Sequence, residues 1–213
     1  RVNSAQTRLM LGLDWDWPEF PPPDPESQAA RPPKVEVMLG DIAKPALTHE
    51  QKTRQDIDRF SAAVNANSDD ATACNNLAWA YLTAPESLRD VNAALPLAEK
   101  AVRLASGPRD RAIFRNTLGL VYYRAGRYRE AAECLEHNLD EQEDWALAFD
   151  LYVLAMSCHK LDEPARARDY HVWANRWVDS RAKREQLTAD QQEELAAFRR
   201  ETEEVLGVRS DER

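Results

Sequence analysis

Seven side chains have the chemistry to bind a metal or act as thiol nucleophiles, and their spacing matches no known ligand pattern. No Cys-x-x-Cys or His-Glu-x-x-His sequence is present. Two of the seven are adjacent and would point in different directions on a helix. The cysteines fall at apolar positions of a repeated helical pattern, where a thiol acts as a small hydrophobic group. We expect no metal and no cofactor. The seven are His49, His137, His159, His171, Cys74, Cys134 and Cys158.

The carboxylates form no recognisable catalytic arrangement either. Glu141–Asp144 and Glu193–Glu194 are typical of solvated helix faces or loops, and Gly12–Asp16 lacks the ligand spacing of a calcium loop. No phosphate loop, dinucleotide fingerprint or nucleophile elbow occurs. The net charge of −9 repels phosphate backbones, which argues against a nucleic-acid partner. The sequence therefore predicts a protein that is not an enzyme.

The elements that position these side chains are helices, and residues 112–140 show this best. One helical face has Gly119, whose missing side chain lets a second helix approach closely. Gly126 follows that helix, where a left-handed cap needs no Cβ. Ala131 recurs on the next helix as a second small residue facing the first. The pattern predicts a hairpin of two closely packed helices.

This hairpin resembles the tetratricopeptide repeat (TPR), whose period is about 34 residues. It departs from the family pattern at Arg115 and Asn138. Related spacings recur on both sides of this hairpin, which gives three repeats at about residues 71–107, 112–144 and 148–180. The resemblance implies an all-α fold, a TPR-like α-solenoid of about three helical hairpins. The matching residues are Leu118, Gly119, Tyr122, Gly126, Tyr128, Ala131 and Leu135.

Capping helices are expected at both ends of a repeat domain over residues 47–207. Thr48–Gln51 and Thr188–Gln191 have the capping-box pattern, which predicts helices at about 48–65 and 188–206. Gly207 is expected to end the second helix. Residues 1–46 contain eight of the twelve prolines and predict a proline-rich extended arm. We expect the arm to dock on a surface of its own or of a neighbour. The alternative is a linker from a preceding domain.

The resemblance also implies a binding surface, because the first helices of TPR hairpins line a concave face. There we expect an apolar groove in which asparagines hold a peptide backbone and Arg124 and Lys160 hold acidic groups. A chaperone-type carboxylate clamp is not expected, since Trp79 and Thr117 stand where it would need asparagine. The expected partner-binding residues are Asn75, Trp79, Asn116, Leu120, Tyr123, Arg124, Tyr152, Met156 and Lys160.

Two functions follow from this surface. The first is a non-catalytic protein–protein interaction scaffold that binds a peptide or partner subunit in the groove. The alternative is a structural assembly or regulatory domain of a larger protein, whose groove is filled by its own N-terminal arm. Asn75–Trp79, Leu97–Val102 and Asn116–Gly119 also resemble C-terminal TPR regions of bacterial multidomain proteins fused to kinase or WD40 modules. That resemblance implies partner domains within a larger parent chain.

Two further properties are read from composition. No apolar run is long enough to span a membrane. Three cysteines without a spacing pattern argue against a disulfide framework. The compartment is left unknown, with a slight preference for the cytoplasm.

Overall fold

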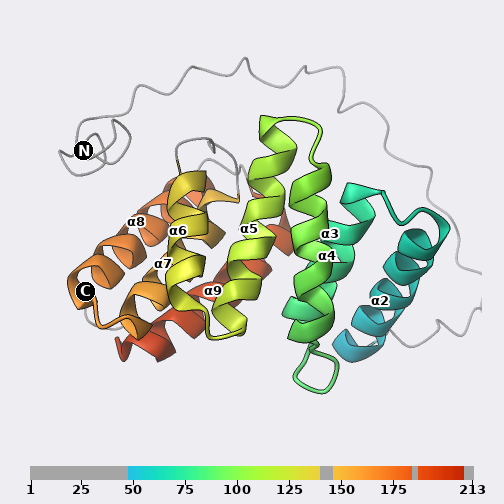
Figure 1. Ribbon diagram of the computed structural model, residues 1–213. Coiled ribbons are helices and arrows are strands. Elements are labelled where there is room, and N and C mark those ends of the chain that lie inside the picture. The colour runs from blue at the N-terminus through green and yellow to red at the C-terminus, as the bar shows by residue number, and fades with distance from the viewer. Residues whose placement is uncertain (1–47, 140–145, 184–186, 209–213) are drawn as a thin grey trace, which may run out of the picture. The chain divides into compact units, whose positions relative to one another are not determined.

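Eight helices make up the part of the chain that the computed structural model describes, namely residues 48–139, 146–183 and 187–208. Figure 1 shows them in order. The described residues belong to one compact unit, and the arm predicted for residues 1–46 lies outside them. The helices are α2 (His49–Ala66), α3 (Ala71–Thr83), α4 (Val91–Leu104), α5 (Pro108–Arg124), α6 (Tyr128–Asn138), α7 (Leu147–Lys160), α8 (Pro164–Lys183) and α9 (Ala189–Leu206).

Three helical pairs form the body of the unit: α3 with α4, α5 with α6, and α7 with α8. Each second helix also packs on the first helix of the next pair, and α3, α5 and α7 neighbour one another in one layer. Helix α2 packs on α3. This arrangement confirms the all-α, TPR-like α-solenoid expected from the sequence.

The turn within each of the last two pairs has one residue in the left-handed region. Gly126 has φ 75°, and the N–H groups of Gly126 and Arg127 donate to the carbonyl oxygens of Tyr123 (3.0 Å) and Tyr122 (2.9 Å). The same bonding recurs after α7, where Asp162 has φ 61° and the Glu163 N–H donates to Cys158 O (2.9 Å). These carbonyls would otherwise lack partners at the helix ends.

The ends of the outer helices follow the sequence signals. The Thr48 and Thr188 side chains accept hydrogen bonds from the backbones of Gln51 and Gln191, and the glutamine side chains accept bonds in return. Helix α9 ends at Gly207, which has φ 67°. Both capping boxes and the glycine stop are therefore confirmed.

Helix α7 lies in the middle of the core, with 11 of its 14 residues buried, so other helices must cover it on every side. Helices α5 and α6 lie next to it in the preceding pair, α8 pairs with it, and α9 covers the face that remains. Burial on this scale requires all four neighbours, which determines where α9 must lie.

Gly119 is where α5 and α6 approach most closely. A Cβ added there would lie well inside van der Waals contact of Cδ2, Cγ and Cδ1 of Leu135, which is fully buried. Leu135, rather than the expected Ala131, is the nearest side chain. A fully buried leucine has little room to move, so the hairpin depends on the missing side chain.

We predict that Gly119→Ala lowers the free energy of unfolding by about 1–3 kcal/mol, because the new methyl group overpacks against Leu135. In a Leu135→Ala background the same change should cost less or stabilise, since the obstacle is gone and alanine favours the helix. Urea denaturation of the four chains measures this coupling. Gly107→Ala is the control, because a Cβ there meets no atom within 4 Å. Equal costs in both backgrounds would contradict the close contact.

We also predict opposite effects at the two left-handed turn positions. Asp162→Gly should raise the free energy of unfolding by up to about 1 kcal/mol, because glycine adopts positive φ without Cβ strain. Gly126→Ala should lower it by about 1 kcal/mol for the same reason. Chemical denaturation measures both changes, and effects of the same sign would refute this account of the turns.

Candidate interaction groove beside helix α9

Helix α9 lies against the layer formed by α3, α5 and α7, which is the expected concave face. In Figure 1 it is the red helix that passes behind α5 and α7. Its backbone packs closest to α7 and then α8, and side chains of α3 and α5 reach it through Trp79 and Arg124. Helix α9 was expected as a cap after the last repeat, and the structure places it across the face predicted to be open.

Three aromatic rings join α9 to this layer. Phe198 of α9 stacks on Trp79 of α3 (centroids 6.0 Å apart, planes 12° apart). It also meets Phe149 of α7 edge to face at 5.0 Å, and Trp79 meets Phe149 at 5.7 Å. Offset-stacked and edge-to-face pairs each stabilise by about 0.5–1.5 kcal/mol beyond their burial. The three rings therefore form one cluster that draws together residues far apart in the chain.

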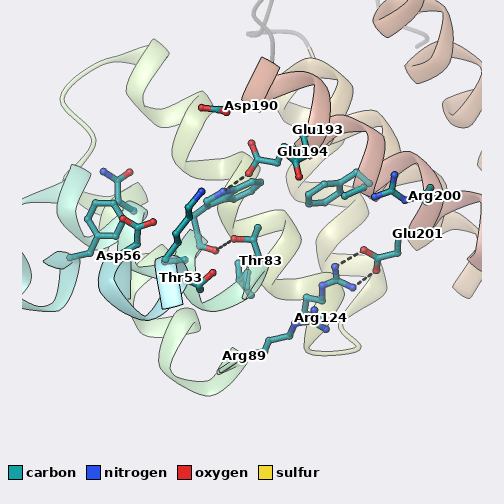
Figure 2. Close-up of a pocket in the computed structure, with 18 residues that line it drawn as sticks. Thr53, Asp56, Thr83, Arg89, Arg124, Asp190, Glu193, Glu194, Arg200 and Glu201 are labelled. Atoms are coloured by element: carbon teal, nitrogen blue, oxygen red, sulfur yellow. Dashed lines mark hydrogen bonds and ion pairs between the residues drawn. The ribbon is translucent and has the colours of Figure 1, made fainter. Parts of the chain in front are cut away.

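Two carboxylates of α9 flank the aromatic cluster (Figure 2). The Trp79 Nε1–H donates to Glu194 Oε1 at 2.9 Å. Arg124 donates from both terminal nitrogens to the two oxygens of Glu201, one of them at 2.6 Å. Burial raises the pKa of Glu194, against the opposing effect of the Trp79 hydrogen bond. These contacts set the register of α9 along α3 and α5.

A groove of about 830 Å³ remains open between α2, α3 and α9. Phe60, Trp79 and Phe198 contribute apolar surface to it. In the view of Figure 2, Asp190, Glu193 and Glu194 from the start of α9 lie at one end, whereas Arg89 and Arg124 lie towards the other. The groove therefore combines aromatic surface with a rim that carries charges of both signs, a composition suited to a peptide with both apolar and charged groups.

Two of the nine expected binding residues, Trp79 and Arg124, line this groove. At most 1% of the surface of Leu120, Tyr152 and Met156 is exposed, and Tyr123 is buried as well. The expectation that these four line an open face is corrected here: helix packing, with α9 over this face, covers them. Tyr152 Oη instead donates to Asn175 Oδ1 at 2.9 Å. Lys160 is exposed but does not line the groove, and Asn75 is buried.

Asn116 belongs to a buried polar network rather than to a peptide-binding surface. Its Nδ2 donates to Asp150 Oδ1 at 2.8 Å, and Asn138 Nδ2 donates to Asp150 Oδ2 at 2.7 Å and to Ala112 O at 3.0 Å. Burial raises the pKa of Asp150 to about 7, although both amide hydrogen bonds lower it. The network joins α5, α6 and α7 through one carboxyl group, and it explains why Asn138 replaces the alanine expected in the repeat.

The cysteines and histidines form no cluster suited to a metal within residues 48–139, 146–183 and 187–208. Burial raises the pKa of both Cys134 and Cys158 to about 12, so both remain thiols at neutral pH. Burial lowers the pKa of His171, whose Nε2 lies 3.0 Å from Asn175 Nδ2. No helix of the described ranges is long and apolar enough to cross a membrane.

The groove residues on α2 and α9 are not predicted by the local sequence patterns. The capping box at Thr188–Gln191 predicts a capping helix there, and Glu193–Glu194 are typical of a solvated face. A signal was present: Glu194, Phe198 and Glu201 are spaced by four and three residues, so they share one side of the helix. Phe198 with a carboxylate on either side of it along one helix face indicates a contact surface rather than a solvated one.

Comparison with known proteins agrees with this fold. A family model described as anaphase-promoting complex, cyclosome, subunit 3 matches residues 87–171, from the loop before α4 into α8. No curated protein and no solved structure matches the chain.

The match and the packed helical pairs together show a TPR-type repeat domain. Domains of this type are interaction scaffolds for other proteins and are typically non-catalytic. The likeness to TPR regions of bacterial multidomain proteins stays a prediction.

We predict a pH dependence that comes from Asp150. Its pKa is about 7 in the folded protein and about 3.9 in an unfolded chain, so between these values the folded state holds the extra proton. The free energy of unfolding should therefore fall as pH rises from about 4 to 7, by on the order of 4 kcal/mol.

The variant Asp150→Asn should lose this fall, because an amide does not titrate. Urea denaturation between pH 4.5 and 7.5 measures it. Asp58→Asn, on the exposed side of α2, is the matched control and should keep the wild-type profile. An unchanged profile in Asp150→Asn would show that Asp150 is ionised in the folded protein throughout this range.

Proposed function

We propose that this chain is a protein-interaction scaffold that binds a peptide segment of a partner in the groove between α2, α3 and α9. The observation that supports this most directly is the open groove of about 830 Å³, with Phe60, Trp79 and Phe198 among its lining residues. Its size falls in the range of ligand sites in proteins. Tryptophan in such a position is a frequent anchor of protein–protein binding energy.

The rims favour a partner segment with charges of both signs. Arg89 and Arg200 are exposed beside the groove, and Asp190 and Glu193 are exposed on the first turns of α9. Complementary charges at a rim fix the orientation of a ligand and speed its association more than they add affinity. We therefore expect a peptide with an apolar anchor at Trp79, flanked by acidic and basic side chains.

The nine residues expected from the sequence divide between two roles in this proposal. Trp79 and Arg124 contact the partner or hold the wall of its groove. The buried members hold the repeats together beneath it, and Lys160 extends the interaction surface beyond the groove. The alternative is an assembly or regulatory domain whose groove is filled by the arm of residues 1–46, which lies outside the described residues.

We predict that Ala197→Arg lowers affinity for groove-binding peptides at least tenfold, about 1.4 kcal/mol. Ala197 is exposed and lines the groove, so a long side chain would fill it at little cost to the fold. The probes are peptides selected from a random displayed library with the wild-type chain, and their affinities are measured by calorimetry. Ala196→Arg is the matched control, because Ala196 is exposed on the same helix but does not line the groove.

The same peptides distinguish the two proposed functions. If residues 48–213 alone bind them as the full chain does, the groove is open to partners and the scaffold role is supported. If removal of residues 1–46 raises affinity more than tenfold, the arm occupies the groove and the alternative is supported. Equal loss of binding in Ala196→Arg and Ala197→Arg would refute the groove as the site.

A further inference from the structure

We infer that the face covered by α9 is itself a recognition site for an acidic amphipathic helix, and that α9 is the occupant supplied by the chain. A partner helix with the same pattern of side chains would bind there in place of α9. The inference extends the proposed function from the open groove to the neighbouring part of the same face. It rests on the proposed function in one respect, namely that this face of the repeat domain contacts partners.

Helix α9 buries one face only, as the outer helix α4 does with three of its 14 residues buried. Four of the 18 residues of α9 are buried, whereas α7 has 11 of 14 buried. Leu195, Phe198 and Thr202 are among the four, and Val205 packs against the core beside them. Their spacing of three, four and three residues is that of a helix that inserts one face into a groove. When such a helix leaves, a second helix must take its place over α7, while the repeats keep their own packed pairs.

Polar contacts add to the aromatic packing of α9 on α3 and α5. Glu201 pairs with Arg124 through two hydrogen bonds, and Glu194 accepts from the Trp79 indole. Glu203 is 9% exposed and contacts Arg199 of the same helix (3.1 Å) and His171 of α8 (3.8 Å). Removing charged groups from water offsets much of the attraction between them, so this interface holds α9 less firmly than an apolar one would. It also makes the site selective for an acidic helix.

Charge complementarity defines the partner. The receptor side contributes the Arg124 guanidinium, the Trp79 N–H and the ring of Phe149. A helix that fits must place a carboxylate, an aromatic residue and a second carboxylate at positions i, i+4 and i+7, as Glu194, Phe198 and Glu201 do. An apolar stripe at the neighbouring positions would cover α7. The site therefore selects an acidic amphipathic helix over a basic or uncharged one.

A charge-swap experiment with the full chain tests this inference, using a labelled synthetic peptide of residues 187–208 as the probe. Glu201→Arg in the chain places a like charge opposite Arg124, so its own α9 binds more weakly. That variant should bind the wild-type peptide at least tenfold more tightly than the wild-type chain does, because the site is vacant more of the time. Fluorescence anisotropy measures the affinities.

The reciprocal pairing tests specificity. Arg124→Glu in the chain should reverse the preference, so that a peptide with Glu201→Arg binds more tightly than the wild-type peptide. Glu204→Arg is the matched control in chain and peptide, because Glu204 is exposed on the outer side of α9 and should leave affinities unchanged. Equal binding of both peptides to both variant chains, or no binding to the Glu201→Arg chain, would overturn the inference. Arg124 and Glu201 also line the open groove, so the peptides selected for it are measured on the same variants. If those peptides bind as before while the residue 187–208 peptide shows no gain, this inference fails and the groove proposal stands.

Hydrogen exchange of the wild-type chain gives a second test that needs no variant. Amides of α9 should exchange through local opening, faster than those of α7, which require global unfolding. Addition of the unlabelled wild-type peptide should leave α7 equally protected, because one helix replaces another on the same face. Exchange of α9 and α7 at the same rate would show that α9 never leaves its site and would overturn the inference.

Discussion

The burial of α7 is the constraint on which the rest of the structure depends. Leu147–Lys160 is apolar around most of its circumference, and a helix of that kind must be surrounded. Helices α5, α6 and α8 cover three sides in the manner of stacked TPR hairpins. The fourth side is the concave face, which a TPR array would leave to its ligand. Here α9 covers it, so the demand for burial links the core of the protein directly to its interaction surface.

Asp150 gives this apolar helix one polar attachment. A carboxyl group in such a place costs stability unless it is hydrogen-bonded, and two amides from neighbouring helices bind it. Apolar contacts alone would allow α5, α6 and α7 to shift along one another with little penalty. Bonds from Asn116 and Asn138 to the two oxygens of one carboxyl group fix a single register. That register sets the spacing of Arg124 and Phe149 beneath α9.

The fold could be predicted from local signals, because each acts within a few residues. Gly126 and Gly207 adopt the left-handed conformations that glycine permits, and Thr48 and Thr188 cap the helices that follow them. The site depends on contacts between distant segments. The Trp79–Glu194 hydrogen bond joins residues 115 positions apart, and no local pattern encodes that meeting. The same helical spacing fits an exposed residue or a covered one, so the burial of Tyr152 and Met156 depends on how the neighbouring helices pack against α7.

Covalent attachment of α9 changes what a partner must achieve. Helix α8 ends at Lys183 and α9 begins at Ala189, so the occupant stays tethered within a few residues of its site. A short tether gives an effective concentration on the order of millimolar, which dilution of the protein does not reduce. A free helix of equal intrinsic affinity would need that concentration to compete equally. The tether therefore prevents helices that bind weakly or are present at low concentration from displacing α9. Only a partner helix that binds more tightly than α9, or that is itself held near the site, displaces it.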